Sequence, residues 1–323
     1  MEKREFKIVK RLGEGGSSHT FLAVDDKGIK YTIKKAKNNN DNIHELLGFE
    51  NEAVILEKIN HPSVPKLVEK LSDGIILEYC EGKTLEKILL EKGTLSERET
   101  ARIAKELTDI LAYLHSKDKC IVYRDIKPAN IIIDNEGHVK LIDFGAARIY
   151  KPGEQNDTQN LGTLGFAAPE QFGNLGQTDP RTDIYCLGMT MLLMISGVDI
   201  KDFEKVKRYK INGINNVSKE FMDIIAKCTR PDRNDRFKAV QEIAAELERY
   251  PARVRKRKAK RSIRIVSLAV VMSFTISVLI SYGNDIKTFA VTDLGRRLPA
   301  VEERIGYARL KIGSYIDDIL GVE

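Results

Sequence analysis

A glycine-rich segment early in the chain has the residue types of a phosphate-binding loop. Between two predicted strands, the sequence reads Gly13-Glu14-Gly15-Gly16-Ser17-Ser18-His19-Thr20. Because glycine has no Cβ, the backbone amides of such a segment can approach phosphate oxygens closely. A glycine-rich hairpin turn explains the same residues equally well, and the position between strands argues against a dinucleotide-binding fingerprint, which precedes a helix. Phosphate binding therefore needs support from other residues.

That support comes from a lysine and a glutamate. Lys34 ends the strand-like run Tyr31-Thr32-Ile33-Lys34, and Glu52 lies near the start of a helical stretch that ends at His61. A lone lysine in a strand is ordinarily a solvated edge residue. Glu52, however, is positioned to reach inward and pair with Lys34, and such a pair would hold the ammonium on the phosphates of a nucleotide. Together with the glycine-rich segment, the two residues predict a nucleotide site.

Three later motifs contain further residues that could do chemistry. They are Tyr123-Arg124-Asp125-Ile126-Lys127-Pro128-Ala129-Asn130, then Asp143-Phe144-Gly145, then Ala168-Pro169-Glu170. With these motifs, residues 6–250 resemble a eukaryotic-type (Hanks-type) Ser/Thr protein kinase, whose activation segment joins the second motif to the third. The resemblance implies a two-lobed α+β kinase fold, with a small β-rich N-lobe over residues 6–80 and a larger helical C-lobe over residues 81–250.

The resemblance also implies the chemistry, which is transfer of the ATP γ-phosphate to Ser or Thr hydroxyls of proteins. Asp125 would accept or orient the hydroxyl proton, and Lys127 would steady the γ-phosphate. Asn130 and Asp143 would supply the oxygen ligands that Mg²⁺ prefers, with Mn²⁺ as an alternative ion. The implied cofactors are therefore ATP and Mg²⁺, and the implied catalytic residues are Asp125 and Lys127.

Contacts to the nucleotide follow from the same resemblance. Lys34 would hold the α- and β-phosphates with Glu52 fixing it, and main-chain amides of the glycine-rich segment would cover the phosphates. Leu77 resembles the gatekeeper, and Glu78 to Cys80 resemble the hinge that meets adenine. The implied nucleotide-binding residues are Gly13, Glu14, Gly15, Gly16, Ser17, Ser18, Lys34, Glu52, Leu77, Glu78 and Cys80.

Other matches favour a protein as the substrate. Asp183 and Gly188 resemble positions of the family's long C-lobe helix, whose aspartate braces the catalytic loop. Arg236 resembles the arginine that pairs with Glu170. A kinase for small metabolites, which is an alternative, would be expected to lack this pair. The resemblance therefore implies protein substrates.

The activation segment contains the candidate phosphorylation sites. Thr163, like Lys127, resembles the Ser/Thr branch of the family. Arg124 would be a buried cation that needs an anion, which suggests a phosphorylated segment and autophosphorylation. Thr158 and Thr163 are the candidate acceptors, and Thr158 is favoured because Thr163 resembles a catalytic-loop contact. The alternative is that the segment orders without phosphate.

Four residues depart from the family pattern. Ser18 stands in place of the third glycine, Thr20 in place of the valine that covers adenine, and Thr32 in place of an alanine. Tyr123 replaces a histidine that packs near Asp143-Phe144-Gly145, and its aromatic ring can serve that role. None of the departures removes a charge that the chemistry requires, so we expect an active enzyme. The alternative is a pseudokinase scaffold that binds nucleotide and partners without turnover.

The residues between the motifs predict the elements that position them. Short β-type runs between Phe6 and Ile33 predict a small antiparallel sheet. Apolar residues at helical spacing predict helices over residues 45–59, 101–114, 183–196, 218–228 and 239–249. Ser96 and Glu99 form a capping box in front of the second of these helices. A strand-rich start followed by a mostly helical chain indicates two lobes.

Charge divides the chain into regions. The net charge over 323 residues is +6, but residues 251–264 alone contain eight Lys or Arg and no acid. Residues 1–250 and residues 285–323 each sum to −1, so no nucleic-acid partner is expected. The four cysteines form no short paired motif, which argues against a disulfide scaffold or a zinc site and fits a reducing cytosolic setting.

An uncharged apolar run follows the basic segment. As a helix, residues 265–282 would be about 27 Å long, enough to cross the core of a bilayer. A buried helix of a soluble domain is the alternative. Because cations precede the run, the positive-inside rule places residues 1–264 in the cytoplasm and leaves residues 283–323 as a short extracytoplasmic tail. The chain thus resembles bacterial kinases that a single C-terminal transmembrane helix anchors in the cell membrane.

The membrane region predicts two further partners. Small residues recur every four positions, at Ala269, Ser273, Ser277 and Ser281. Such a seam allows close packing of two helices and predicts a homodimer, although hydroxyls that bond to their own helix explain it equally well. The basic segment 251–264 is a topogenic signal, a patch for anionic lipid headgroups, or both. Nuclear targeting is the weaker alternative because the apolar run adjoins it.

Overall fold

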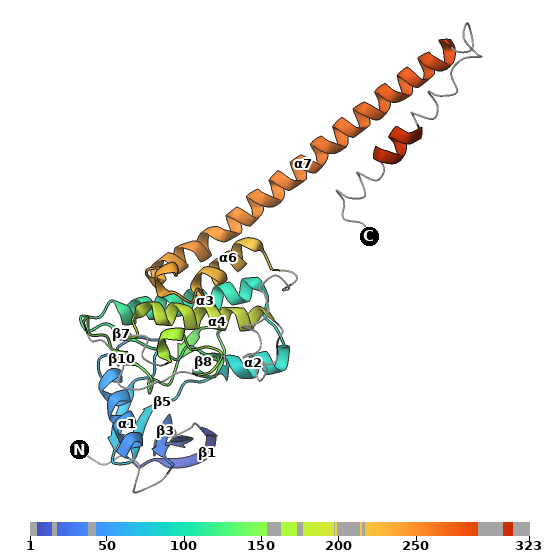
Figure 1. The fold of residues 1–323 in the computed structure, drawn as a ribbon. Coiled ribbons are helices and arrows are strands. Elements are labelled where there is room, and N and C mark those ends of the chain that lie inside the picture. Colours follow the sequence, from blue (N-terminus) through green and yellow to red (C-terminus); the bar gives the residue numbers. More distant parts are fainter. Residues whose placement is uncertain are drawn as a thin grey trace. The chain divides into compact units, whose positions relative to one another are not determined.

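The computed structural model in Figure 1 contains a β-rich lobe and a helical lobe within its first unit. The chain divides into two units, Met1–Val254 and Arg255–Glu323. The structure describes residues 5–14, 18–37, 43–153, 163–172, 177–196, 198, 214, 217–289 and 306–312. The β-rich lobe and the helical lobe confirm the expected two-lobed α+β architecture.

An antiparallel sheet forms the smaller lobe. Its strands are β1 (Lys7–Glu14), β2 (Ser18–Val24), β3 (Lys30–Ala36), β4 (Leu67–Leu71) and β5 (Gly74–Glu78). Their order in space is β1-β2-β3-β5-β4, and each neighbouring pair is antiparallel. Side chains alternate between the two faces of a strand, so one face carries a buried apolar cluster and the opposite face carries Lys34. The cluster consists of Ala23, Tyr31, Ile33 and Ile76.

Helix α1 (Ile43–Leu56) packs against β4 and β5. Its residues Phe49, Ala53 and Leu56 are buried, and their spacing of four and three residues places them on one side of the helix. Glu52 lies three residues after Phe49 and is buried on the same side. The spacing that packs the helix therefore also turns Glu52 toward the sheet.

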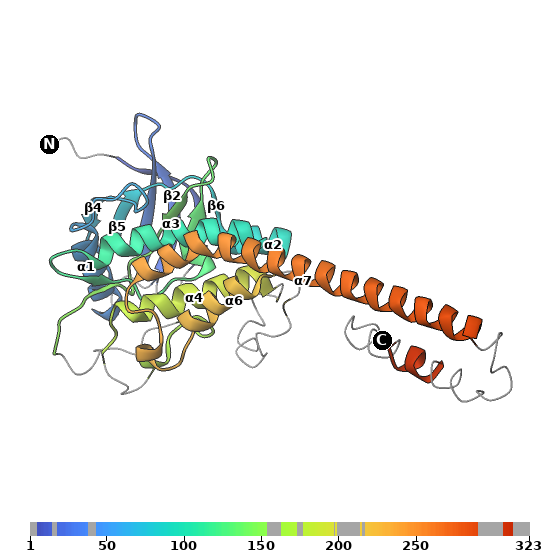
Figure 2. The ribbon, with the colours of Figure 1, turned by 90° about the horizontal axis from the view of Figure 1, so that it is seen from above.

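Helices form most of the larger lobe. They are α2 (Leu85–Lys92), α3 (Glu97–His115), α4 (Pro180–Ser196), α6 (Lys219–Cys228) and the first turns of α7 (Val240–Phe289). Helix α4 packs against both α3 and α6, as Figure 2 shows, and its side chains from Thr182 to Ile195 are all buried. A Cβ at Gly188 would lie 2.6 Å from the Cβ of Cys228. Glycine at this position therefore permits the close packing of α4 on α6.

The capping box at the start of α3 is confirmed. The Ser96 hydroxyl oxygen accepts the Glu99 N–H at 3.2 Å, and the Glu99 carboxylate accepts the Ser96 N–H at 3.0 Å. Both bonds satisfy backbone donors that a helix N-terminus leaves without partners. The start of α3 is thereby fixed.

Short strands hold both ends of the motif-bearing segments. They are β6 (Lys83–Thr84), β7 (Ile121–Val122), β8 (Ile131–Ile133), β9 (Val139–Leu141) and β10 (Arg148–Ile149). Strands β6, β8 and β9 form one sheet, and β7 pairs with β10. Because β7 and β8 flank residues 123–130 and β9 and β10 flank residues 142–147, the two loops are anchored on both sides.

Helix α7 differs from the expectation of separate segments. The sequence predicts a helix over residues 239–249 and another over 265–282, whereas α7 is continuous from Val240 to Phe289 and contains Pro251. Lys and Arg have high helix propensities, which favours helix through the basic segment. Among the described residues, this is the one helix long and apolar enough to cross a membrane, with a mean hydropathy of 2.3 over its most apolar stretch.

Candidate active site

The ammonium of Lys34 joins the two lobes. Lys34 Nζ lies 2.5 Å from Glu52 Oε1 on α1 and 2.8 Å from Asp143 Oδ1. Asp143 belongs to the helical lobe, so one lysine connects the sheet, the helix and the Asp143 loop. The predicted pairing of Lys34 with Glu52 is present in the structure.

Electrostatics favour the charged forms of Lys34 and Asp143. Burial lowers the pKa of Lys34, but the charges of Asp143 and Glu52 outweigh burial, and the resulting pKa lies above its ordinary value. The Lys34 charge holds the pKa of Asp143 below its ordinary value. Burial raises the pKa of Glu52, an effect that Lys34 opposes. A lysine that stays protonated is suited to hold anionic phosphate oxygens.

The catalytic motif forms a hydrogen-bonded network around Asp125. Lys127 Nζ lies 2.8 Å from Asp125 Oδ2 and donates to Thr163 Oγ1 at 2.7 Å. The Thr163 hydroxyl donates to Asp125 Oδ1 at 2.8 Å, and Asn130 Nδ2 donates to Asp125 Oδ2 at 2.8 Å. Thr163 is therefore in contact with the catalytic loop, as its position in the sequence predicts.

The donor atoms at this site fit a hard divalent cation. Asn130 uses Nδ2 to donate to Asp125, which leaves its Oδ1 as the atom able to bind a cation. Asp143 carries a charge because of Lys34, and Lys34 and the Gly145 N–H both contact its Oδ1. Carboxylate and amide oxygens are the ligands that Mg²⁺ prefers. The residues present therefore fit the ion that the sequence implies.

A buried aspartate fixes the backbone of the catalytic loop. Asp183 of α4 accepts the N–H groups of Tyr123 at 2.9 Å and Arg124 at 2.7 Å, and it contacts His115 Nε2 at 2.8 Å. The Arg124 φ of 69° and the Asp143 φ of 68° lie in the left-handed region, which costs energy for a residue with a side chain. The bonds to Asp183 hold Arg124 in its strained conformation.

Tyr123 serves the packing role expected of it. Its ring lies edge-on to Phe144 with ring centroids 5.0 Å apart, and its hydroxyl donates to the Ile142 carbonyl. Burial raises the pKa of Tyr123 well above its ordinary value, so the hydroxyl keeps the proton that it donates. Tyr123 therefore connects the catalytic loop to the Asp143-Phe144-Gly145 loop by packing and by a hydrogen bond.

Asn51 is a further residue of the site that its motif does not reveal. Asn51 Nδ2 donates to the Ala147 carbonyl at 3.0 Å, and the adjacent Glu52 accepts the Phe144 N–H at 3.1 Å. Arg124 Nε donates to the Ala146 carbonyl at 2.6 Å. Helix α1 is thus bonded to the loop that follows Asp143 as well as to Lys34. The adjacency of Asn51 to Glu52 is the only sequence signal of this contact.

The predicted hinge and glycine-rich segment lie at the two ends of the sheet. Leu77 is buried on β5 directly opposite Thr32, and Glu78 ends the same strand. Burial raises the pKa of Cys80 to about 11, so its thiol stays protonated.

The described residues of the glycine-rich segment lie on β1 and β2. On β1, Gly13 pairs with Thr20, and Glu14 Oε1 lies 2.7 Å from Lys37 Nζ. Ser18 begins β2.

Several predicted residues lie outside the described part of the chain. They are Gly15, Gly16, Ser17 and Thr158. Their roles stay predictions from the resemblance. Thr163 is described, and its hydroxyl bonds to Asp125 and Lys127, so its phosphorylation also stays a prediction.

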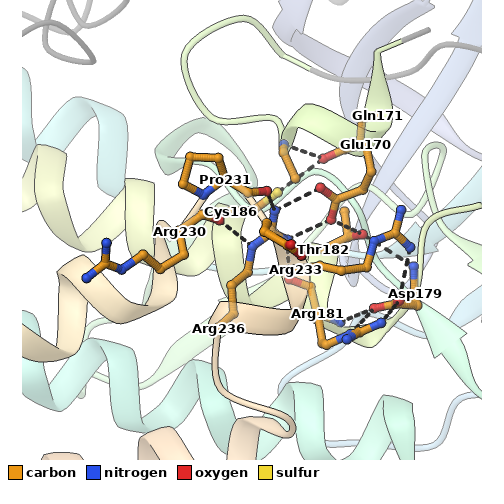
Figure 3. Close-up of polar contacts among 12 residues, drawn as sticks. Glu170, Gln171, Asp179, Arg181, Thr182, Cys186, Arg230, Pro231, Arg233 and Arg236 are labelled. Atoms are coloured by element: carbon orange, nitrogen blue, oxygen red, sulfur yellow. Dashed lines mark hydrogen bonds and ion pairs between the residues drawn. The ribbon is translucent and has the colours of Figure 1, made fainter. Parts of the chain in front are cut away.

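A buried ion pair holds the end of the activation segment on the helical lobe (Figure 3). Arg236 Nη1 and Nη2 donate to the two carboxylate oxygens of Glu170 at 2.7 and 2.8 Å, and both side chains are almost fully buried. Glu170 also accepts from the Thr182 hydroxyl at 2.9 Å. The remaining Arg236 donors reach three carbonyl oxygens, those of Arg181, Arg230 and Pro231. The predicted pairing is present, with every polar group satisfied.

This fold and site define a class of protein. Protein kinases have a small antiparallel sheet and a helical lobe. A lysine between two carboxylates joins these lobes, and a catalytic-loop aspartate lies in the helical lobe. Residues 6–247 match the family model described as the protein kinase domain. The chain belongs to the protein kinase family.

Curated relatives include several Ser/Thr kinases. The chain is 30% identical to serine/threonine-protein kinase F of Synechocystis over an alignment of 270 residues. This alignment covers 74% of the chain and 54% of the relative. It is 27% identical to serine/threonine-protein kinase PrkC of Bacillus subtilis over 262 residues, and this alignment covers 75% of the chain and 40% of the relative. It is 30% identical to serine/threonine-protein kinase PknA of Nostoc over 271 residues, and this alignment covers 75% of the chain and 47% of the relative. The chain thus spans about half the length of these relatives.

Proposed function

We propose that the chain is a Ser/Thr protein kinase that transfers the γ-phosphate of MgATP to protein hydroxyls, including those of its own activation segment. The observation that carries this proposal is the position of Lys34 between Glu52 and Asp143, at 2.5 and 2.8 Å. This arrangement holds a protonated amine beside an ionised carboxylate. Phosphoryl transfer needs both charges together, one for the phosphates and one for the metal ion.

The chain's own residues act by position and charge. The Asp125 carboxylate would receive the proton of the substrate hydroxyl, and Asn130 and Lys127 hold that carboxylate by bonds of 2.8 Å. Lys34 would bind the α- and β-phosphates. Asn130 and Asp143 would hold Mg²⁺, which neutralises phosphate charge when bound. The hinge residues Glu78 to Cys80 would meet the base.

Two contacts support a protein Ser or Thr as the acceptor. The Thr163 hydroxyl bonds both Asp125 and Lys127, so the segment that would receive a substrate is attached to the catalytic loop. The Glu170–Arg236 pair anchors the other end of that segment. The curated relatives named above carry Ser/Thr kinase names.

Label transfer tests the proposal. The 323-residue chain, purified in detergent, is incubated with γ-³²P-ATP and Mg²⁺ together with a general protein acceptor. We expect label on Ser and Thr residues of the acceptor and of the chain, and none with Lys34→Ala. Label on a small molecule with none on protein would contradict the proposal, and so would an inert chain that still binds nucleotide.

Asn51 provides a finer test of how α1 is positioned. An Asn51→Ala variant loses the bond to the Ala147 carbonyl, so α1 and Glu52 hold Lys34 less firmly. Since a neutral hydrogen bond contributes about 1 kcal/mol, we expect about a fivefold loss in kcat/KM for ATP. Asn60→Ala, which removes an exposed amide at the end of the same region, serves as the control and should change kcat/KM less than twofold. Equal effects of the two variants would contradict the role of Asn51.

We also propose that residues 265–282 anchor the chain in the cell membrane, with residues 6–250 on the cytoplasmic side and 283–323 beyond the membrane. The described side chains from Ile265 to Tyr282 are almost all exposed in helix α7, and an apolar helix with that surface needs a lipid environment. The eight cations of 251–264 favour the cytoplasmic side.

Arginine substitution tests the membrane anchor. An arginine near the centre of a spanning helix costs about 2.5–3.5 kcal/mol, so Val270→Arg combined with Phe274→Arg should release the chain from membranes into the supernatant of an alkaline carbonate wash. The control is Val54→Arg, since Val54 is an exposed valine of α1. Equal retention of both proteins in the membrane pellet would contradict the anchor.

Two proposals concern partners at the membrane. The seam of small residues from Ala269 to Ser281 would pair two copies of the helix, which would raise the local concentration for phosphorylation of one chain by the other. The basic segment 251–264 would bind anionic headgroups. Crosslinking of the chain in lipid nanodiscs tests the first proposal, because Ser273→Leu with Ser277→Leu should reduce the dimer. A comparison of nanodiscs that contain phosphatidylglycerol with nanodiscs that lack it tests whether the basic segment binds anionic headgroups.

A further inference from the structure

The loop between α1 and β4 joins the smaller lobe to the helical lobe. It consists of residues 57–66. The Asn60 N–H in this loop donates to the Tyr113 hydroxyl oxygen on α3 at 2.8 Å. The Ser63 carbonyl accepts the Leu141 N–H of β9, also at 2.8 Å. The loop is therefore bonded to two elements of the helical lobe, α3 and β9.

His61 lies between these two attachments and folds the loop. Its Nδ1 accepts the Ser63 N–H at 3.1 Å, and its ring packs against the Tyr113 ring with centroids 4.9 Å apart. The carbonyl of the next residue, Pro62, accepts a hydrogen bond from Lys140 Nζ of β9 at 3.0 Å. One histidine thus closes a turn in the loop and contacts the tyrosine that holds the loop on α3.

The bond from Ser63 requires the neutral imidazole. A ring nitrogen that accepts a hydrogen bond carries no proton, whereas both ring nitrogens of a protonated histidine are donors. Protonation of His61 would therefore replace the hydrogen bond to Ser63 by a contact between two N–H groups. It would also place a second cation near Lys140.

Charged groups of the neighbouring elements act on His61. Burial lowers the pKa of His61 below its ordinary value of 6.5, the Lys140 charge lowers it further, and Asp109 of α3 opposes both effects. Lys117, two residues after α3, lies above the Tyr113 ring, with Nζ 4.4 Å from the ring centroid. The folded loop therefore contains the neutral form of His61 at neutral pH.

The loop also determines where α1 ends, and with it the position of Glu52. Glu52 lies about one turn before Leu56, the last residue of α1. The Glu52 carboxylate accepts the Phe144 N–H of the helical lobe at 3.1 Å and pairs with Lys34 of the sheet at 2.5 Å. A helix end that the loop holds on α3 keeps Glu52 close to both groups.

We propose that neutral His61 is a positioning residue for phosphoryl transfer, because it holds the loop 57–66 on the helical lobe and thereby holds Glu52 against Lys34. This inference rests on the proposed function, in which Lys34 binds phosphates. His61 touches no substrate and acts through the loop and α1. When His61 is protonated the turn opens, and the folded protein transfers phosphate more slowly.

The pH dependence of phosphate transfer tests the inference. Initial rates of ³²P transfer from ATP to a general protein acceptor, with the 323-residue chain in detergent, give kcat/KM for ATP. His61→Asn places an amide oxygen near the position of Nδ1, and this oxygen accepts a hydrogen bond without titrating. The ratio of kcat/KM for His61→Asn to that for the unaltered chain should rise about fivefold between about pH 7.5 and about pH 5, which corresponds to one neutral hydrogen bond. Titration of ATP and of Asp125 affects both proteins and cancels in the ratio.

Two further variants complete the comparison. His61→Leu removes the acceptor at every pH, so its kcat/KM should be about fivefold below that of the unaltered chain at about pH 7.5, and the two should converge toward about pH 5. His138→Asn removes an exposed histidine of the helical lobe and is the control, with a ratio to the unaltered chain that changes less than twofold. Urea unfolding at both pH values shows whether each protein is folded, and if His61→Leu is unfolded, His61→Asn decides alone.

The outcomes separate a positioning role from other roles. A ratio for His61→Asn that is constant with pH, or that follows the ratio for His138→Asn, would overturn the inference. A pH-dependent difference in the free energy of unfolding without a change in the activity ratio would give His61 a structural role only. Both results leave the proposed function intact. Absence of phosphate transfer by the unaltered chain at about pH 7.5 would instead remove the proposed function, and this inference with it.

Discussion

An Asp125→Asn variant of the chain should lose about 10³-fold in kcat while binding ADP with unchanged affinity. The substitution keeps the shape of the side chain and removes the charge that would receive the hydroxyl proton, and general-base catalysis contributes about 10²–10⁴-fold to rate. The bonds from Asn130 and Lys127 to Asp125 converge on that charge. The nucleotide would be held by other residues, namely Lys34 and the hinge.

Paired measurements on one preparation check this result. Initial rates of ³²P transfer give kcat, and calorimetric titration with ADP gives the Kd. Asp109→Asn, an exposed carboxylate of α3, is the control for loss of a negative charge and should transfer phosphate at the rate of the unaltered chain. If the unaltered chain and Asp125→Asn were equally inert while both bound ADP, the chain would be a pseudokinase scaffold.

The charged residues of the site could be predicted from the sequence because each lies in a short motif. Asp125 and Asn130 belong to one loop, and Asp143 begins another, so their neighbours along the chain restrict their roles. The partner of Lys34 could also be predicted, since Glu52 lies three residues after Phe49 and must share the buried side of its helix. Local spacing was sufficient for these residues.

Other features depend on contacts that local spacing does not encode. Asn51 bonds Ala147, which is 96 positions away, and a polar residue beside a helix gives no sign of such a partner. The position of Thr20 directly opposite Lys34 depends on the register between β2 and β3. The continuity of α7 depends on the helix propensity of the basic segment. By charge alone, that segment resembles a boundary between two separate helices.

Replacement of Arg236 should have the largest effect on stability. In an Arg236→Met variant the Glu170 carboxylate stays buried without its partner, and breaking a buried ion pair from one side costs about 3–5 kcal/mol. The bidentate bonds of 2.7 and 2.8 Å and the side-chain exposures of 0% and 4% place the pair in the buried class. Urea unfolding of the chain in detergent, followed by tyrosine fluorescence, measures the loss.

An exposed arginine pair supplies the matched control. Arg253 is paired with Glu246, with side-chain exposures of 42% and 26%, and exposed ion pairs contribute about 0–1 kcal/mol. Arg253→Met should therefore change the free energy of unfolding by less than about 1 kcal/mol. Similar losses for Arg236→Met and Arg253→Met would show that burial of the Glu170–Arg236 pair does not determine its contribution.

The pH dependence of the Arg236→Met effect gives a second test. Burial raises the pKa of Glu170, but the hydrogen bonds and charge of Arg236 outweigh burial and hold the pKa below its ordinary value of 4.5. A carboxyl with a pKa lowered by folding stabilises the protein above its unfolded pKa, and this stabilisation is lost as the pH falls through the folded pKa. In Arg236→Met, burial without the arginine raises the pKa of Glu170, so the variant takes up a proton before the unaltered chain does as the pH falls. The difference in stability should therefore be largest near neutral pH and narrow as the pH falls toward and through about 4.5. A difference that stayed constant into acid would mean that the lost stability comes from the Arg236 contacts to backbone carbonyls, which do not titrate.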